Sequence, residues 1–236
     1  METQKTPGAK KPVLYAEASY VLGMVILALG TALMERADFG MSMVVAPAYL
    51  LHLKFSPALP FLTFGMAEYL LQGALLVVMM LLLRRVRKYY FFSFVTAVLY
   101  GLTLDLCIAL AAPLPAGGLV LRTVYYVLGM VLGSIGVALF LRTYIAPEVY
   151  ELLVKELSAA RRMDVGRVKT AYDCISCAAS VAMSFAFFGF GHFEGVKAGT
   201  IVCALVNGTL ISLISRWLGA HFDERDALPL RRFFKA

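Results

Sequence analysis

The sequence predicts an all-α membrane protein. Its six transmembrane helices are expected to form two inverted three-helix repeats, each with an interfacial segment after its first helix. Three observations lead to this fold class. The 236-residue chain is 61% hydrophobic and 16% charged, whereas a soluble domain is about half apolar and about a quarter charged. The apolar residues gather in long uncharged runs, and one apolar phrase of the sequence occurs twice.

Six apolar runs are long enough to cross a bilayer. A helix of about 20 residues spans the hydrocarbon core, and the runs cover residues 19–35, 62–83, 91–112, 120–141, 168–190 and 196–218. They are continuous rather than alternating, so we expect helices and not barrel strands. We expect the first run to be retained, because Met34-Glu35-Arg36-Ala37-Asp38 after it makes a poor signal-peptide cleavage site.

The basic residues predict the orientation of the chain and account for its net charge of +7. If the N-terminus is cytoplasmic and each run crosses once, the cytoplasmic segments hold every basic residue except Arg36, Lys54, Arg122 and Lys197. This distribution follows the positive-inside rule and predicts that both termini are cytoplasmic. Orientation and anionic lipid explain the positive charge, so we expect a lipid bilayer as partner and no nucleic acid.

The repeated phrase predicts an internal duplication. "VLGMVILALGTAL" (21–33) returns as "VLGMVLGSIGVAL" (127–139), an offset of 106 residues that keeps both glycines in place. Three spans per repeat is an odd number, so the second repeat must enter the membrane inverted, as is common in secondary transporters. Gly129 and Gly133 in the second copy also form the GxxxG pattern of closely packed membrane helices.

This duplication sets the expected domain boundaries. The chain divides into a cytoplasmic tail (1–18), a first repeat (19–112), an external hairpin (113–119), a second repeat (120–218) and a basic cytoplasmic tail (219–236). A non-spanning stretch follows the first helix of each repeat, at Met41–Leu53 and Pro147–Ala160. The second stretch is amphipathic, with apolar residues at helical spacing, so we expect a helix on the cytoplasmic membrane surface.

Two glycine-rich helices, the segment "ALMERADFGMSMVVAPAYLL" (32–51) and the six-span layout resemble the YczE/YitT-type bacterial integral membrane proteins. The resemblance covers most of residues 21–218 and rests mainly on glycines and apolar residues. It implies a multi-pass protein of the bacterial plasma (inner) membrane from a largely uncharacterised family. It implies no substrate and no functional residues.

Ionisable residues inside the apolar runs are the first candidate functional groups, because a charge in hydrocarbon needs a partner or a water-filled cavity. Arg36 and Glu68 lie near the outer ends of their spans, and Arg142 and Asp173 lie near the inner ends. We therefore predict two equivalent ion pairs, Arg36–Glu68 and Arg142–Asp173. Two roles stay open for these pairs: they lock helix ends, or they act as alternating gates.

Asp105 is the deepest acid, and Ser212 replaces it at the matching position of the second repeat. We predict for Asp105 either an inert pair with Arg122, which reaches toward it by snorkelling, or a carboxylate that binds a ligand amine or couples to protons. The full set of candidate substrate-binding or coupling residues is Asp105, Glu68, Gln72, Asp173, Asn207, Arg122 and Tyr126.

The inverted layout favours a small-molecule transporter with a site between the repeats. Two alternatives stay open: a membrane-embedded regulatory, assembly or partner protein without a transported solute, and the substrate-binding subunit of a larger uptake complex. We expect no enzyme, because no nucleophile–base pair or phosphate-binding glycine loop is present. We also expect no cofactor or metal, because the cysteines lie inside spans and the histidines outside them. A solute, a protein partner and a second copy of the chain stay open as partners.

Overall fold

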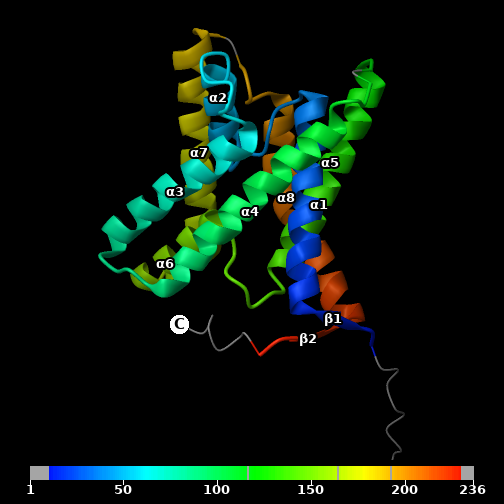
Figure 1. Cartoon of the computed structure of the whole chain (residues 1–236), viewed down its shortest axis with the longest axis vertical. Helices are drawn as coiled ribbons and strands as arrows, with labels where there is room; N and C mark the ends of the chain where they lie inside the picture. Colours follow the sequence, from blue (N-terminus) through cyan, green and yellow to red (C-terminus); the bar gives the residue numbers. More distant parts are fainter. Residues whose placement is uncertain (1–10, 116, 164, 192, 230–236) are drawn as a thin grey trace, which may run out of the picture.

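The computed structural model describes residues 11–115, 117–163, 165–191 and 193–229. These residues form eight helices and two short strands (Figure 1). In chain order the elements are β1 (Val13–Tyr15), α1 (Ala16–Ala37), α2 (Ala46–Phe55), α3 (Phe64–Leu83), α4 (Lys88–Ala111), α5 (Leu119–Phe140), α6 (Val149–Arg161), α7 (Val165–Phe188), α8 (Ala198–His221) and β2 (Asp223–Arg225).

Six of these helices, α1, α3, α4, α5, α7 and α8, are long and apolar enough to cross a membrane. The predicted all-α fold with six spanning helices is therefore confirmed. Their outward faces carry large apolar side chains, such as Leu81 on α3 and Leu205 on α8, which are 71% and 76% exposed. Contact with lipid tails removes such side chains from water in a bilayer.

The two ends of the described part of the chain, at β1 and β2, lie at the same end of the bundle. β1 pairs in parallel with β2, with Leu14 opposite Glu224, and Figure 1 shows both strands below the helices. We call this the strand end, and we call the opposite end, where residues 112–118 join α4 to α5, the hairpin end. Because β1 and β2 lie at the same end of the bundle, the chain between them must cross it an even number of times, as six spanning helices do.

The two copies of the repeated phrase lie on α1 and α5, which pack against each other in antiparallel directions. Gly23 lies against Gly136, and Gly30 lies against Gly129. A Cβ atom on Gly30 would sit 2.6 Å from the backbone nitrogen of Gly133, so the two backbones touch directly. Because Gly23 matches Gly129 and Gly30 matches Gly136 in the sequence, exchanging the two copies turns one contact into the other.

The short helix α2 begins beside the middle of α7. The Ser176 hydroxyl of α7 donates a hydrogen bond to the Met43 carbonyl just before α2, at 2.7 Å. The Lys54 ammonium near the end of α2 donates to the Phe187 carbonyl near the end of α7, at 3.0 Å. At the helical rise, about 17 Å separates Ser176 from Phe187, roughly half of the hydrocarbon thickness. The segment before α2 therefore reaches from the hairpin end to mid-span.

The short helix α6 lies in the matching way beside α3, from the strand end. The Val149 N–H in its first turn donates to Oε1 of Gln72 in the middle of α3, at 3.0 Å. Near its other end, Glu156 accepts hydrogen bonds from Arg87 and Tyr90, where α3 gives way to α4. We expected this helix on the membrane surface. Its start instead lies deep between spanning helices, because its apolar face packs on protein rather than on lipid.

The helix contacts come in pairs when the two halves are exchanged. α1 packs on α4 as α5 packs on α8, α2 packs on α7 as α6 packs on α3, and α2 packs on α3 as α6 packs on α7. Two contacts have no counterpart of this kind among the described residues. The larger is the contact of α3 with α4, since α7 and α8 do not pack closely on each other, and the smaller is the contact of α4 with α6, since α8 does not pack closely on α2. Figure 1 shows α8 beside α1 and α5, and α7 at the other side of the molecule.

Candidate functional site

Both predicted ion pairs are wrong. The Arg36 guanidinium donates hydrogen bonds to the Leu114 carbonyl rather than to Glu68. Arg142 pairs with Glu224 of β2 and donates to the Ser215 carbonyl. Asp173 pairs with Lys169, one turn before it on α7, at 3.1 Å. Equal depth in the membrane did not bring these side chains together, because each of the two arginines and Asp173 is held by a different partner.

Asp105 caps the start of α3 instead of pairing with Arg122. Its Oδ2 accepts a hydrogen bond from the Thr63 hydroxyl at 2.6 Å, and its Oδ1 accepts one from the Gly65 N–H at 2.7 Å. These bonds satisfy a free backbone donor at the helix N-terminus. The predicted Asp105–Arg122 pair is therefore wrong, and both hydrogen bonds serve the helix end.

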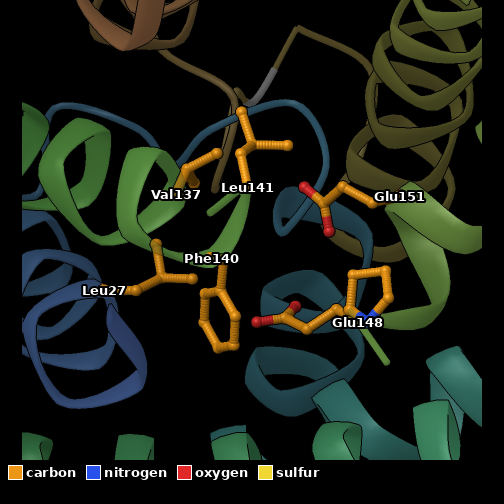
Figure 2. A pocket seen from close by; sticks show the side chains of 7 residues that line it. Leu27, Val137, Phe140, Leu141, Glu148 and Glu151 are labelled. Atoms are coloured by element: carbon orange, nitrogen blue, oxygen red, sulfur yellow. The ribbon is translucent and has the colours of Figure 1, made fainter. Parts of the chain in front are cut away.

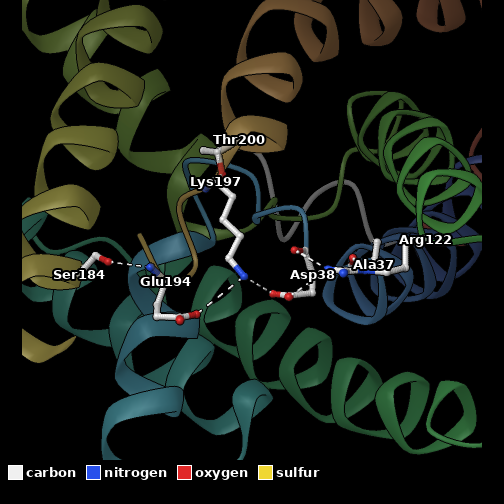
Figure 3. A network of polar contacts seen from close by, with 7 residues as sticks. All are labelled: Ala37, Asp38, Arg122, Ser184, Glu194, Lys197 and Thr200. Carbon is white, nitrogen blue, oxygen red and sulfur yellow. Dashed lines mark hydrogen bonds and ion pairs between the residues drawn. The ribbon is translucent and has the colours of Figure 1, made fainter. Parts of the chain in front are cut away.

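Arg122 belongs to a polar network at the hairpin end that ties α1, α5 and α8 together (Figure 3). Its guanidinium donates to the carbonyl of Ala37 and pairs with the Asp38 carboxylate at 3.0 Å. The Lys197 ammonium pairs with the same carboxylate at 2.6 Å and lies 3.8 Å from Glu194. The contacts join the ends of helices and account for Arg122 structurally.

Two other candidates also serve helix packing. The Tyr126 hydroxyl of α5 donates to the Gly199 carbonyl at the start of α8. The Ser134 hydroxyl, further along α5, donates to Oδ1 of Asn207 on α8 at 2.7 Å. Both bonds hold α8 against α5.

Gln72 and Glu68 are the two candidates that the structure brings together, and Glu148 joins them from the loop before α6. One amide nitrogen, Nε2 of Gln72, donates to Oε1 of Glu68 at 3.4 Å and to Oε2 of Glu148 at 3.2 Å. The side chains of Glu68 and Gln72 are fully buried, and Glu148 is 6% exposed. Two acidic side chains therefore share one neutral amide in the protein interior. We call Glu68, Gln72 and Glu148 the carboxylate cluster.

The cluster has oxygen atoms without partners. Oε2 of Glu68, Oε1 of Glu148 and the Tyr150 hydroxyl are buried and make no hydrogen bond of normal geometry within the described structure. The Tyr150 hydroxyl nevertheless lies close enough to Glu68 for the two groups to interact. No described lysine, arginine or histidine forms an ion pair with Glu68 or Glu148. A buried carboxylate without a compensating charge or donor is costly. Such groups mark sites that take up a proton, a cation or a ligand.

A small cavity lies next to the cluster. Its volume is about 20 Å³, which is room for one water molecule. Figure 2 shows the Glu148 carboxylate pointing toward the ring of Phe140, with Glu151 on the other side of the space. The lining residues are Leu27, Val137, Phe140, Leu141, Pro147, Glu148 and Glu151. Glu148 and Glu151 are the titratable residues in this mainly apolar lining.

The surroundings favour the neutral form of Glu148 and Glu151, which lie outside the spanning helices. Burial, together with the charges of Glu151 and Glu68, raises the pKa of Glu148 well above its usual range. Burial also raises the pKa of Glu151, although Lys169 of α7 acts against this rise. Burial and the neighbouring Glu68 raise the pKa of the Tyr150 hydroxyl. Glu148 therefore holds a proton at a pH where an exposed glutamate has lost it.

The importance of Glu148 and Tyr150 was missed by reasoning from sequence. The sequence analysis predicted an amphipathic surface helix over Pro147–Ala160 and singled out neither Glu148 nor Tyr150 within it. The sequence signal that could have found them is Pro147-Glu148, a proline and an acid directly before a helix. Among the described residues, no group of three histidine, cysteine or acidic side chains is arranged to hold a metal ion.

The comparisons with known proteins place the chain in a family without assigning it an activity. A family model described as a family of unknown function, DUF6198, matches residues 14–216, and the chain belongs to this family. No curated protein and no solved structure matches the chain. The likeness to YczE/YitT-type proteins stays a prediction, while the expectation of an uncharacterised family of multi-pass membrane proteins is met.

Proposed function

We propose that the chain is a small-molecule transporter whose two inverted halves exchange conformations around a site between them. The observation that carries this proposal is the unequal packing of two equivalent helix pairs. Gly101 of α4 lies against the backbone of Gly65 of α3, with no space for a Cβ. Gly208, its counterpart on α8, has no atom within 4 Å of the position where a Cβ would be.

This inequality is what alternating access requires of an inverted repeat. If both halves are built from one design, the contact that α3 and α4 make is also open to α7 and α8. Closing α7 on α8 while α3 parts from α4 would give a second state of similar energy. Two states of similar energy are the physical basis of a transport cycle.

The solute site would lie at mid-span, where α2 and α6 begin. Irregular backbone at this depth is tolerated where it is buried in protein or lines a cavity. In transporters, the ends of such short helices supply backbone N–H groups and carbonyls to solutes and ions. The carboxylate cluster lies at the start of α6, which supports a role of Glu68, Gln72 and Glu148 in coupling. The proposal includes no chemical reaction on the solute.

The proposal also assigns the chain to a membrane and gives its orientation there. The excess of basic residues in alternate loops supports an orientation with both termini in the cytoplasm. The resemblance to YczE/YitT-type proteins supports the bacterial plasma membrane as the location. Under this orientation, the strand end of the bundle faces the cytoplasm. In the described state α3 packs on α4 while α7 and α8 stay apart. Exchanging these two contacts would open the site first to one side of the membrane and then to the other.

The test is Gly208→Leu, compared with Thr209→Leu. A leucine at 208 fits the structure as it stands but would block closure of α7 on α8. Thr209 is exposed, and its counterpart Leu102 is 58% exposed, so a leucine at 209 should face lipid. We expect both variants to keep the wild-type melting temperature, while Gly208→Leu loses solute-driven current at least about tenfold, or about 1.4 kcal/mol.

The current is measured on liposomes that carry purified protein, with a panel of amines, amino acids, carboxylates and sugars. Wild type and Thr209→Leu should respond to at least one of these classes. If wild type responds to none of them, the proposal fails in favour of a partner protein or an uptake-complex subunit. Equal currents from wild type and Gly208→Leu would overturn the closure of α7 on α8.

Cross-linking gives an independent test of the second state. In a background with all four cysteines replaced by alanine, Ala171→Cys and Gly208→Cys place thiols at the counterparts of Gly65 and Gly101. A short thiol cross-linker should join them in membranes, and an active solute should change the rate. Ser134→Cys with Asn207→Cys is the control, because these side chains touch in the structure. Cross-linking of the control alone would contradict the second state.

A further inference from the structure

We infer that Glu68 and Glu148 form a binding site for one exchangeable proton, shared across the amide of Gln72. The inference deepens the proposed function and rests on it for the role of the proton, which is coupling to transport. The binding itself involves only the carboxylate cluster. A hydronium ion transfers a proton to a carboxylate oxygen: one O–H bond of hydronium breaks, one forms on the carboxyl group, a water molecule is left, and one negative charge of the pair is neutralised.

The geometry of the amide is the first step. The two hydrogens of Gln72 Nε2 are directed at Glu68 and Glu148, and the oxygen of the same amide accepts from the Val149 N–H. Gln72 therefore satisfies one oxygen of each acid and has no further hydrogen to give. Both carboxyl groups lie within hydrogen-bond distance of a single nitrogen atom, so two negative charges here would repel each other at short range.

The unpartnered oxygens are the second step. Oε2 of Glu68 and Oε1 of Glu148 are buried and accept no hydrogen bond of normal geometry, although the Tyr150 hydroxyl lies near Glu68. Protonation of either atom converts an unsatisfied acceptor into a hydroxyl donor. Because the two acids interact, the proton belongs to the pair rather than to one residue.

Among the described residues, the groups around the pair offer no competing positive charge at close range. Lys169 is the cation associated with this region, and it pairs with Asp173 and influences Glu151. The titratable neighbours of the pair come from four helices: Tyr20 of α1, Tyr100 of α4, Tyr150 and Glu151 of α6, and Tyr172 of α7. The tyrosines are neutral and Glu151 is acidic, so a single added proton is the simplest compensation for the pair.

The cavity beside Glu148 gives the proton a route. About 20 Å³ admits one water molecule and excludes an organic solute. Glu151, which is half-buried, lies across this space from Glu148 (Figure 2). A water molecule there would connect the two carboxyl groups, so a proton can reach Glu148 through Glu151 while the solute stays outside.

Infrared difference spectroscopy of the purified full chain tests the site without any knowledge of the solute. A protonated carboxylic acid has a C=O stretch that is separate from the bands of carboxylates and amides. We expect wild type at neutral pH to show one such band, which disappears as the pH is raised. Glu68→Gln and Glu148→Gln should each remove or shift the band, while Asp223→Asn, at an exposed acid of β2, should leave it unchanged.

The outcomes separate this inference from the proposed function. The proton site is overturned if wild type lacks the band at neutral pH, or if the band survives in both glutamine variants. Neither outcome requires that a variant transports a solute. A band that disappears on addition of sodium chloride or a primary amine at constant pH overturns the assignment of a proton in favour of a larger cation. If the band behaves as expected but the protein shows no solute-driven current, the result supports the proton site. It then counts only against the proposed transport function.

Discussion

At the scale of single residues, the structure separates charges that hold the fold from charges that carry unsatisfied oxygen atoms. Asp105, Arg122 and Asp173 have close partners that explain them. Glu68 and Glu148 share one amide and are left with a free oxygen each. Since a buried carboxylate is stabilised by a partner or neutralised by a proton, these two acids are where the pH should act on the molecule.

The pH dependence of stability has a definite sign. Because the pKa of Glu148 is raised in the folded protein, the folded state binds a proton more tightly than the unfolded state. This contribution to stability is complete below the ordinary carboxyl pKa and is lost as the pH rises toward the raised value. We expect the melting temperature of wild type to fall as the pH rises from the ordinary carboxyl pKa toward the raised value. Over this pH range the free energy of unfolding should decrease by up to about 1.4 kcal/mol per pH unit for one proton.

Glu148→Gln removes the titrating group and keeps an oxygen that accepts from Gln72. We expect its melting temperature to vary less with pH and to exceed that of wild type at the upper end of the range. Asp223→Asn is the control for a change of one charge at an exposed site. A Glu148→Gln variant with the same pH dependence as wild type would show that Glu148 is ionised in the folded protein throughout the range.

At the scale of elements, the contact between α1 and α5 sets the centre of the bundle. The glycines let two backbones approach to a distance that any side chain would prevent. Gly133 is different from its neighbours, because a Cβ there would find its nearest atom, in Leu27, at 3.9 Å. Of the two glycines in the GxxxG pattern, Gly129 therefore has no space for a side chain in the helix contact, whereas Gly133 has.

Gly30→Ala and Gly133→Ala form a matched pair on the two sides of this contact. We expect Gly30→Ala to lower the free energy of unfolding by about 1–3 kcal/mol, because its Cβ would meet the backbone of α5. Gly133→Ala should have little effect or stabilise slightly, since alanine favours the helix. Melting temperatures in detergent compare the two. Equal melting temperatures for both variants would contradict the direct backbone contact.

The elements also show how far the sequence could go. The six spanning helices were predictable because apolar length alone decides them, and no knowledge of packing was needed. The position of α6 was not predictable in this way. Its apolar residues, such as Val149 and Leu152, would suit a lipid surface or a groove between helices equally well, and only the packing with α3 and α4 decides between them.

The candidate site shows the same limit. Glu68 and Gln72 were predicted as candidates because polar groups inside an apolar run need a reason. Their partner Glu148 was not, because no spacing along the chain relates residue 148 to residue 72. The predicted ion pairs failed for a related reason: sequence gives the depth of a side chain in the membrane, while the rotation of each helix about its axis comes from its neighbours.

At the scale of the whole molecule, both described chain ends lie at one end of the bundle, which makes the orientation testable. We expect a fluorescent protein fused after residue 236 to fluoresce, and an alkaline phosphatase fused there to be inactive, as for a cytoplasmic terminus. The same phosphatase inserted at Gly117, in the hairpin between α4 and α5, should be active. Active phosphatase at residue 236 would reverse the orientation while leaving the fold as described.

The pairing of β1 with β2 has a consequence for biogenesis. β1 precedes all six spanning helices and β2 follows all of them, so the two strands can meet only after the last helix has been inserted. The strand pair therefore forms last, after all six spanning helices are in place. A chain whose insertion stops before α8 therefore leaves both edges of β1 unpaired, whereas in the completed bundle β2 covers one of them.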